Sequence, residues 1–145
     1  MDIITQLTQQ MNTILSAAAS EYAHALQDTD LRGCQMSYLL AVCQCPGMTQ
    51  DALAGYLGVD KSNVARQVAV LEEDGFITRT PSAADKRVME LYPTEKTLAL
   101  MPQLEEIVCQ WDKIVTAGIS EEEVQTVVRI LEIMKSNAAA WVNKK

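Results

Sequence analysis

Residues 49–75 have the sequence TQDALAGYLGVDKSNVARQVAVLEEDG, which predicts two short helices joined by a tight turn. Thr49 is a favourable N-cap for the first helix, and Gly58 follows its last turn, where a left-handed backbone is needed. Asp60 is a favourable N-cap for the second helix. Two helices in this arrangement are typical of a helix-turn-helix, whose second helix enters the DNA major groove with its N-terminal residues facing base edges.

The second helix has one apolar stripe and a marked end. Val64, Val68 and Leu71 follow each other at i, i+4 and i+7, which predicts a face that packs on the first helix and the core. The Gly75–Phe76 pair that follows is expected to end the helix in a Schellman motif and to turn the chain into an extended run.

The opposite face of this helix is polar and cationic. Its candidate DNA-contacting residues are Lys61, Ser62, Asn63, Arg66 and Gln67. An arginine on a polar helix face is, taken alone, usually a solvated charge. After the start of a second helix of this kind, a contact between Arg66 and a base or phosphate is the favoured interpretation.

A hairpin is predicted directly after the helix. Residues 76–80 and 87–92 are β-prone runs, and the turn-rich segment 81–86 separates them. The tip of the hairpin holds one acid and two cations, Asp85, Lys86 and Arg87. A hairpin that follows a recognition helix is a wing, and a cationic tip can reach a phosphate or the electronegative minor groove.

The charged wing residues have different expected roles. Arg87 is the minor-groove candidate, with Lys86 as a neighbouring phosphate contact. Asp85 would repel phosphates, so we expect it to cap the turn or to form an ion pair that orients the arginines. For Arg79, the alternative to a DNA contact is that it holds the wing by pairing across the hairpin.

At this point the sequence resembles a known family. LGVDKSNVARQVAVLEEDGFI (57–77) and ADKRVMELYPT (84–94) resemble the winged-helix core of the MarR family of bacterial transcription regulators. The Asp-Xaa-Arg motif of that family's wing is matched by Asp85-Lys86-Arg87. The resemblance implies a mainly α (α+β) fold with a small two- or three-stranded wing sheet. It also implies a single domain, 1–145, whose DNA-binding lobe covers about residues 32–92.

Long helical flanks lie on both sides of this lobe. The apolar spacing predicts helices over about 3–26 and 32–45, and a third that Thr94 can cap and that Pro102 would kink or shift. Ser120 and Glu123 form a capping box for the last helix.

The function of these flanks has two interpretations. Periodicity alone favours an intramolecular cover and a dimer interface equally. The family resemblance implies that residues 1–28 and 94–142 interlock into a homodimer. A two-fold dimer would present two recognition helices about one DNA turn apart, ~34 Å, which predicts a pseudo-palindromic operator.

Composition fits one compact globular unit but leaves a question of charge. The chain has 145 residues, of which 48% are hydrophobic and 21% charged. Its net charge of −7 argues superficially against DNA binding. Segment 60–92 carries five cations and six acids, and Glu72, Glu73 and Asp74 lie at the far end of the helix. The contact surface is therefore expected to be weakly positive, with few phosphate contacts.

Four cysteines, Cys34, Cys43, Cys45 and Cys109, are expected to be reduced and buried. The alternative is redox sensing, for which Cys43 and Cys45 are the best pair. The resemblance to the MarR family implies this alternative, since some of its members respond to oxidants through cysteine. With His24 as the single histidine, the sequence offers no good set of zinc ligands, and no metal or other cofactor is expected.

An enzyme is not expected, because the sequence has no glycine-rich phosphate loop, no paired-histidine motif and no nucleophile with a recognisable base. No signal peptide or membrane span is recognisable, so a cytoplasmic location is expected. The function expected from the residues and the resemblance together is a sequence-specific regulator that binds double-stranded DNA and acts as a repressor. The rival hypothesis is a winged helix that binds proteins and not DNA.

Control by a small aromatic effector is implied by the resemblance alone. Candidate lining residues for an effector cleft are Tyr22, Met36, Tyr38 and Trp111. Core packing explains each of these four side chains equally well.

Overall fold

The structure is a computed structural model that describes residues 2–144, and its contacts group into two compact units, Met1–Val108 and Cys109–Lys145. The first unit contains α1 (Ile3–Ala25), the 3-10 turn η1 (Gly33–Gln35), α2 (Met36–Gln44), β1 (Met48–Thr49), α3 (Gln50–Leu57), α4 (Lys61–Glu73), β2 (Ile77–Pro81) and β3 (Met89–Pro93). Helix α5 (Glu95–Val115) runs from the first unit into the second, which also contains α6 (Glu121–Val142). The predicted mainly helical fold with a small sheet is confirmed.

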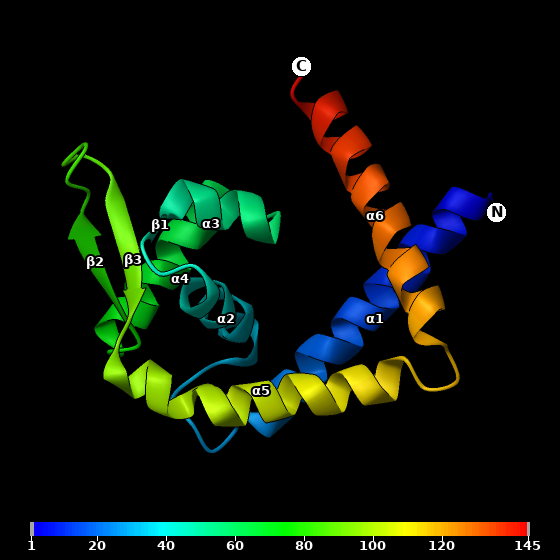
Figure 1. Ribbon diagram of the computed structural model, residues 1–145, viewed down its shortest axis with the longest axis horizontal. Helices are drawn as coiled ribbons and strands as arrows, with labels where there is room; N and C mark the ends of the chain where they lie inside the picture. The colour runs from blue at the N-terminus through cyan, green and yellow to red at the C-terminus, as the bar shows by residue number, and fades with distance from the viewer. Residues whose placement is uncertain (1, 145) are drawn as a thin grey trace. The chain divides into compact units, whose positions relative to one another are not determined.

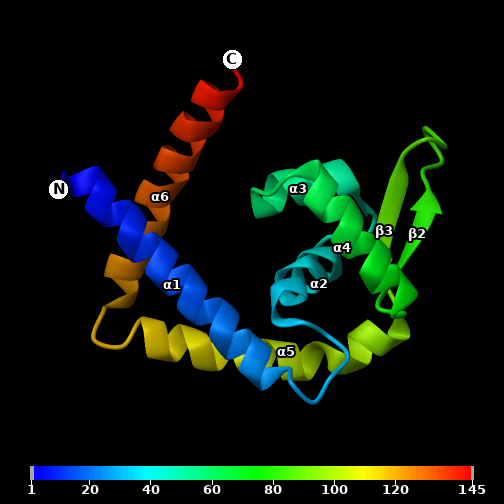
Figure 2. The ribbon, with the colours of Figure 1, turned by 180° about the vertical axis from the view of Figure 1, so that it is seen from behind.

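The sheet is antiparallel with strand order β1-β3-β2. Ile77 pairs with Pro93 and Pro81 with Met89, so β2 and β3 form the predicted hairpin, one or two residues later than the sequence indicated. The two-residue strand β1 pairs with the other edge of β3 and makes the sheet three-stranded. Figures 1 and 2 show α2, α3 and α4 beside this sheet, with the β2–β3 hairpin projecting past them.

The helix-turn-helix forms at the predicted residues. Thr49 caps α3 by accepting a hydrogen bond from the Ala52 amide (3.1 Å), and Gly58 has the left-handed φ of 67° that ends this helix. Asp60 occupies the N-cap position of α4, but its carboxylate makes no capping hydrogen bond, contrary to expectation. The first turn is closed by the Val64 amide, which donates to the Asp60 carbonyl (3.0 Å).

Helix α4 ends in the predicted Schellman motif. The Phe76 amide donates to the Leu71 carbonyl (2.8 Å), and the Gly75 amide donates to the Glu72 carbonyl (3.0 Å). Gly75 has a φ of 79°, a conformation that a side chain would strain. The chain therefore leaves α4 at a fixed angle and enters β2.

The hydrophobic core lies between α2, α3, α4 and the sheet. Val64, Val68 and Leu71 are fully buried, as the apolar stripe predicted. Their buried neighbours from other elements are Leu26, Leu31, Met36, Tyr38, Leu39, Ala41, Val42, Leu53, Ala54, Phe76, Ile77, Leu91, Leu104 and Ile107. At roughly 1.5–3 kcal/mol for each fully buried aliphatic or aromatic side chain, this cluster supplies the main stabilisation of the lobe.

The junction of α4, β2 and α5 is held by hydrogen bonds to the backbone carbonyls of Asp74 and Phe76. The buried Thr97 hydroxyl and the Thr94 amide both donate to the Phe76 carbonyl. Lys96 Nζ donates to the Asp74 carbonyl at the end of α4 (2.7 Å) and lies 4.2 Å from the centroid of the Phe76 ring. A cation at this place also interacts favourably with the negative, C-terminal end of the α4 dipole.

Most apolar side chains of α1 and α6 are not in this core. No residue of α1 or α6 is buried within the unit to which it belongs, and Ile14, Val128 and Trp141 are among the exposed ones. Helix α5 continues through Pro102, and its buried face is made by Thr97, Leu104 and Ile107. Leu98, near the start of α5, is 54% exposed.

None of the helices in residues 2–144 combines the length and the apolar character that crossing a bilayer requires.

The hydroxyl of Thr97 provides a test of the junction. Thr97→Val keeps the shape of the side chain but removes the donor to the Phe76 carbonyl, so we expect a loss of about 1 kcal/mol in the free energy of unfolding. Urea unfolding at one protein concentration measures this difference. Thr126→Val is the matched control, because the exposed Thr126 hydroxyl donates to a carbonyl within α6. Equal changes for both variants would contradict the assigned role.

Candidate nucleic-acid interface

The outer face of α4 carries the predicted contact residues. Lys61, Ser62 and Arg66 are exposed, whereas Asn63 and Gln67 are half-buried. Lys61 Nζ lies 3.3 Å from a carboxylate oxygen of Asp51 at the start of α3, and both side chains are more than 70% exposed. An exposed pair of this kind is weak, so the lysine can exchange its carboxylate partner for a phosphate at little cost.

Gln67 differs from its neighbours because a buried side chain already contacts it. Its Oε1 accepts a hydrogen bond from Nε2 of Gln35 (3.2 Å), which lies in η1 and is fully buried. Gln67 is thus placed at the edge between the core and the outer face of α4, and the orientation of its amide is set from inside the protein.

In the wing, Asp85 and Arg87 form a compact turn. The Arg87 amide donates to Asp85 Oδ1 (3.0 Å), and the guanidinium donates to both carboxylate oxygens, from Nε (3.1 Å) and from Nη2 (3.2 Å). These hydrogen bonds hold the pKa of Asp85 below its usual value. The carboxylate combines the two roles expected of it, a turn cap and an ion pair with an arginine.

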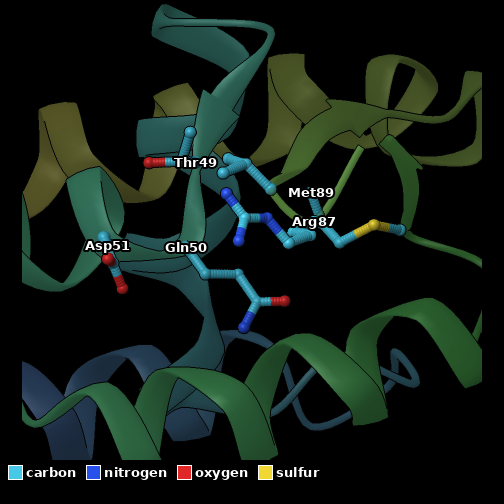
Figure 3. A pocket seen from close by; sticks show the side chains of 6 residues that line it. Thr49, Gln50, Asp51, Arg87 and Met89 are labelled. Carbon is cyan, nitrogen blue, oxygen red and sulfur yellow. The ribbon is translucent and has the colours of Figure 1, made fainter. Parts of the chain in front are cut away.

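Arg87 lies two residues before the start of β3 and close to the start of α3. It lines a cavity of about 230 Å³ together with Thr49, Gln50 and Asp51. Figure 3 shows its guanidinium directed towards the side chains of Thr49 and Gln50. The Arg87 side chain is nevertheless 90% exposed, and Lys86 beside it is also exposed, so both cations remain accessible.

Arg79 holds the wing to α4, and the expectation of a partner across the hairpin was wrong. Its Nη2 and Nε donate to the two carboxylate oxygens of Glu72 (2.8 and 3.2 Å). The hydrogen bonds lower the pKa of Glu72 and raise that of Arg79. Glu72 lies in the last turn of α4 and Arg79 in β2, so this bidentate pair fixes the wing relative to the recognition helix.

The four effector candidates differ in their surroundings. Met36 is fully buried and Tyr38 is 5% exposed, so both belong to the core, and burial raises the pKa of Tyr38. Tyr22 is half-buried at the end of α1. Trp111 belongs to the second unit.

The expectation of buried cysteines was wrong. Cys34, Cys45 and Cys109 are exposed, and Cys43 is half-buried. Burial raises the pKa of the Cys43 thiol, which keeps it protonated and less nucleophilic. Within residues 2–144 no group of histidine, cysteine and acidic side chains is arranged to hold a metal ion.

Two residues that hold this surface in place were missed by sequence reasoning. Gln35 carried a usable signal, because it is a polar residue among the apolar positions of the second predicted helix. Glu72 was counted only as an unfavourable charge at the end of α4, although it is the partner of Arg79. Both act through contacts between different elements, which helical periodicity does not indicate.

Comparisons with known proteins agree with this geometry. The model of the MarR family matches residues 34–89, from η1 to the start of β3. The uncharacterised HTH-type transcriptional regulator YybA of Bacillus subtilis (strain 168) is 28% identical over 134 residues, which cover 92% of this chain and 89% of that protein.

Solved structures are similar over almost the whole chain. The crystal structure of the transcriptional regulator SlyA has a TM-score of 0.87 at 28% identity and covers 96% of this chain and 99% of its own. A putative MarR family regulator from Listeria monocytogenes, in complex with a 26-mer DNA, has a TM-score of 0.82 at 24% identity and covers 98% of this chain and 93% of its own.

These similarities include the recognition helix, the wing and both helical flanks, and the relatives are regulators and not enzymes. The chain is therefore similar to the MarR family of winged helix-turn-helix transcriptional regulators.

Proposed function

We propose that this protein is a cytoplasmic repressor that binds a pseudo-palindromic operator in double-stranded DNA as a homodimer. Helix α4 lies in the major groove in this proposal, and the wing reaches the adjacent backbone and minor groove. A small-molecule or oxidant signal releases the complex. Repression and release are the parts that rest most on similarity to the family.

One observation carries the DNA-binding part of this proposal. Asp51 at the start of α3 pairs with Lys61 at the start of α4 and also lines the cavity that contains Arg87. The cationic start of the recognition helix and the wing arginine are therefore gathered around one point of the surface. A duplex that approaches this point meets cations from two elements at once, as major-groove and minor-groove contacts require.

The dimer is supported by apolar side chains that the described units leave in solvent. On α6 these include Val127, Val128, Ile133 and Trp141, each more than half exposed. On α1, Ile3, Ile4 and Leu15 are exposed to a similar degree. A soluble monomer seldom exposes so many large apolar residues on two helices, and a second copy of the chain would cover them.

The release signal has two candidate receptors. An aromatic effector would use the surface near Tyr22, because Met36 and Tyr38 are already packed in the core. An oxidant would meet the exposed thiol of Cys45 more readily than the half-buried thiol of Cys43. A shift of dimer geometry by either signal would prevent both recognition helices from fitting the operator together.

The first prediction concerns the two arginines. Arg66→Ala should weaken binding to the selected operator by about 1–3 kcal/mol, which is roughly tenfold or more, because a base or phosphate contact is lost. Arg87→Ala should weaken binding and reduce the dependence of log K on log salt by about one. Gel-shift titrations at several salt concentrations measure both effects.

Lys135→Ala is the control for these variants, because it removes one exposed cation from α6, where Lys135 pairs with nearby Glu132 (2.7 Å). Its affinity should stay within about twofold of the parent. If all three variants bind DNA equally well, the cations of the winged helix do not contact DNA. The rival hypothesis of a protein-binding winged helix would then be favoured.

The second prediction concerns the apolar face of α6. Val128→Asp combined with Ile133→Asp places two charges where both side chains are more than half exposed within their unit. If a second copy covers this face, the charges oppose dimerisation, and light scattering should report a monomer that no longer shifts the operator. An unchanged parent mass at micromolar concentration would contradict the proposed use of this face.

A further inference from the structure

The hydrogen bond between Gln35 and Gln67 joins η1 to the recognition helix across 32 residues of sequence. The position of η1 is itself tightly set by α1. A Cβ at Gly33 would lie 2.6 Å from the Ala23 amide nitrogen, so the backbone of η1 can approach α1 this closely only with glycine. Gln35 therefore contacts α4 from a fixed support.

A backbone amide determines which end of each side-chain amide donates and which accepts in this contact. The Arg32 amide can only donate, and it donates to Oε1 of Gln35 (3.1 Å). The other end of the Gln35 amide is then Nε2, which can only donate to Gln67. Gln67 must therefore present its oxygen to Gln35, which leaves its own NH₂ group as the outer end of the amide.

We propose that Gln67 reads the operator as a hydrogen-bond donor and that Gln35 is the positioning residue that imposes this polarity. The inference rests on the proposed function, because it requires α4 to lie in the major groove. It goes beyond that function by assigning the kind of base edge that Gln67 recognises and the buried residue that determines the choice.

The opposite orientation of the Gln35 side-chain amide is disfavoured by the backbone amide of Arg32. If the Gln35 amide rotated by half a turn, its NH₂ group would face the Arg32 amide, and two donors would meet without an acceptor. Gln35 is fully buried, so water cannot easily repair this contact. A glutamine without such a restraint rotates freely and pairs with adenine through its oxygen and nitrogen together.

A donor in the major groove discriminates between bases in a defined way. Guanine presents two acceptors, O6 and N7, whereas cytosine presents only the N4 donor. Gln67 should therefore favour guanine and reject cytosine on the strand that it contacts. With its oxygen turned towards Gln35, the paired contact to adenine is no longer the preferred one.

The experiment is selection of bound duplexes from a random pool, followed by measured affinities for guanine and cytosine at each selected position. The parent should show one position per half-site at which guanine is preferred over cytosine by about tenfold to a hundredfold, and Gln67→Ala should abolish that preference. Gln35→Met should reduce it to about threefold or less, although Gln35 does not contact DNA. A loss of fold would weaken binding to all sequences and would not change one base preference.

Two further variants test the polarity directly by changing Gln67 itself. Gln67→Lys keeps a donor at the outer end, so guanine should remain preferred, and adding Gln35→Met should change nothing. Gln67→Glu provides only acceptors, so the preference should move to cytosine, whose N4 group can donate. Circular dichroism and dimer mass establish that each variant is folded.

The outcomes separate this inference from the proposed function. If the parent selects no sequence, the proposed function fails. If the parent selects an operator but Gln67→Ala changes affinity equally for every base, Gln67 contacts a phosphate and the inference is overturned. It is also overturned if Gln35→Met retains the full preference of the parent at the position assigned to Gln67.

Discussion

The carbonyl oxygen of Phe76 is the point on which the DNA-binding lobe depends. It accepts hydrogen bonds from the Thr97 hydroxyl and the Thr94 amide, and the amide of the same residue closes the Schellman motif of α4. The recognition helix, the wing and α5 therefore meet at one residue whose ring is 1% exposed. Because Gly75 fixes the exit angle, a small change at this junction would move the helix and the wing together.

The recognition helix is held at its C-terminal end and along one side. Gln35 holds its middle through Gln67, Arg79 holds its last turn through Glu72, and Lys96 binds its terminal carbonyl at Asp74. Its exposed start remains free to contact a partner. This division has a physical reason, since a reading surface must be accessible but must not move relative to its scaffold. The acids at the end of α4, which looked unfavourable for DNA binding, include the carboxylate that anchors the wing.

The features that sequence predicted are local ones. Thr49 and Gly58 mark the bounds of α3 because caps and left-handed glycines act within one helical turn, and the stripe from Val64 to Leu71 follows from periodicity alone. The partner of Arg79 and the bond between Gln35 and Gln67 were not predicted, because each joins two elements whose relative placement is a tertiary property. The cysteines were expected to be buried on general frequency, but Cys34, Cys45 and Cys109 lie on exposed positions of their elements.

A chain with a net charge of −7 places particular demands on how it recognises DNA. Few cations are available to neutralise phosphates, so non-specific attraction to DNA is weak. At low salt, the acidic residues elsewhere in the protein also repel the phosphates over a long range. Affinity must then come from a small number of well-placed contacts. A homodimer, as proposed, would make this set of contacts twice on one operator. The proposed contact of Gln67 with DNA, oriented by Gln35, would fit this need, because an oriented hydrogen bond contributes discrimination that an additional lysine would not.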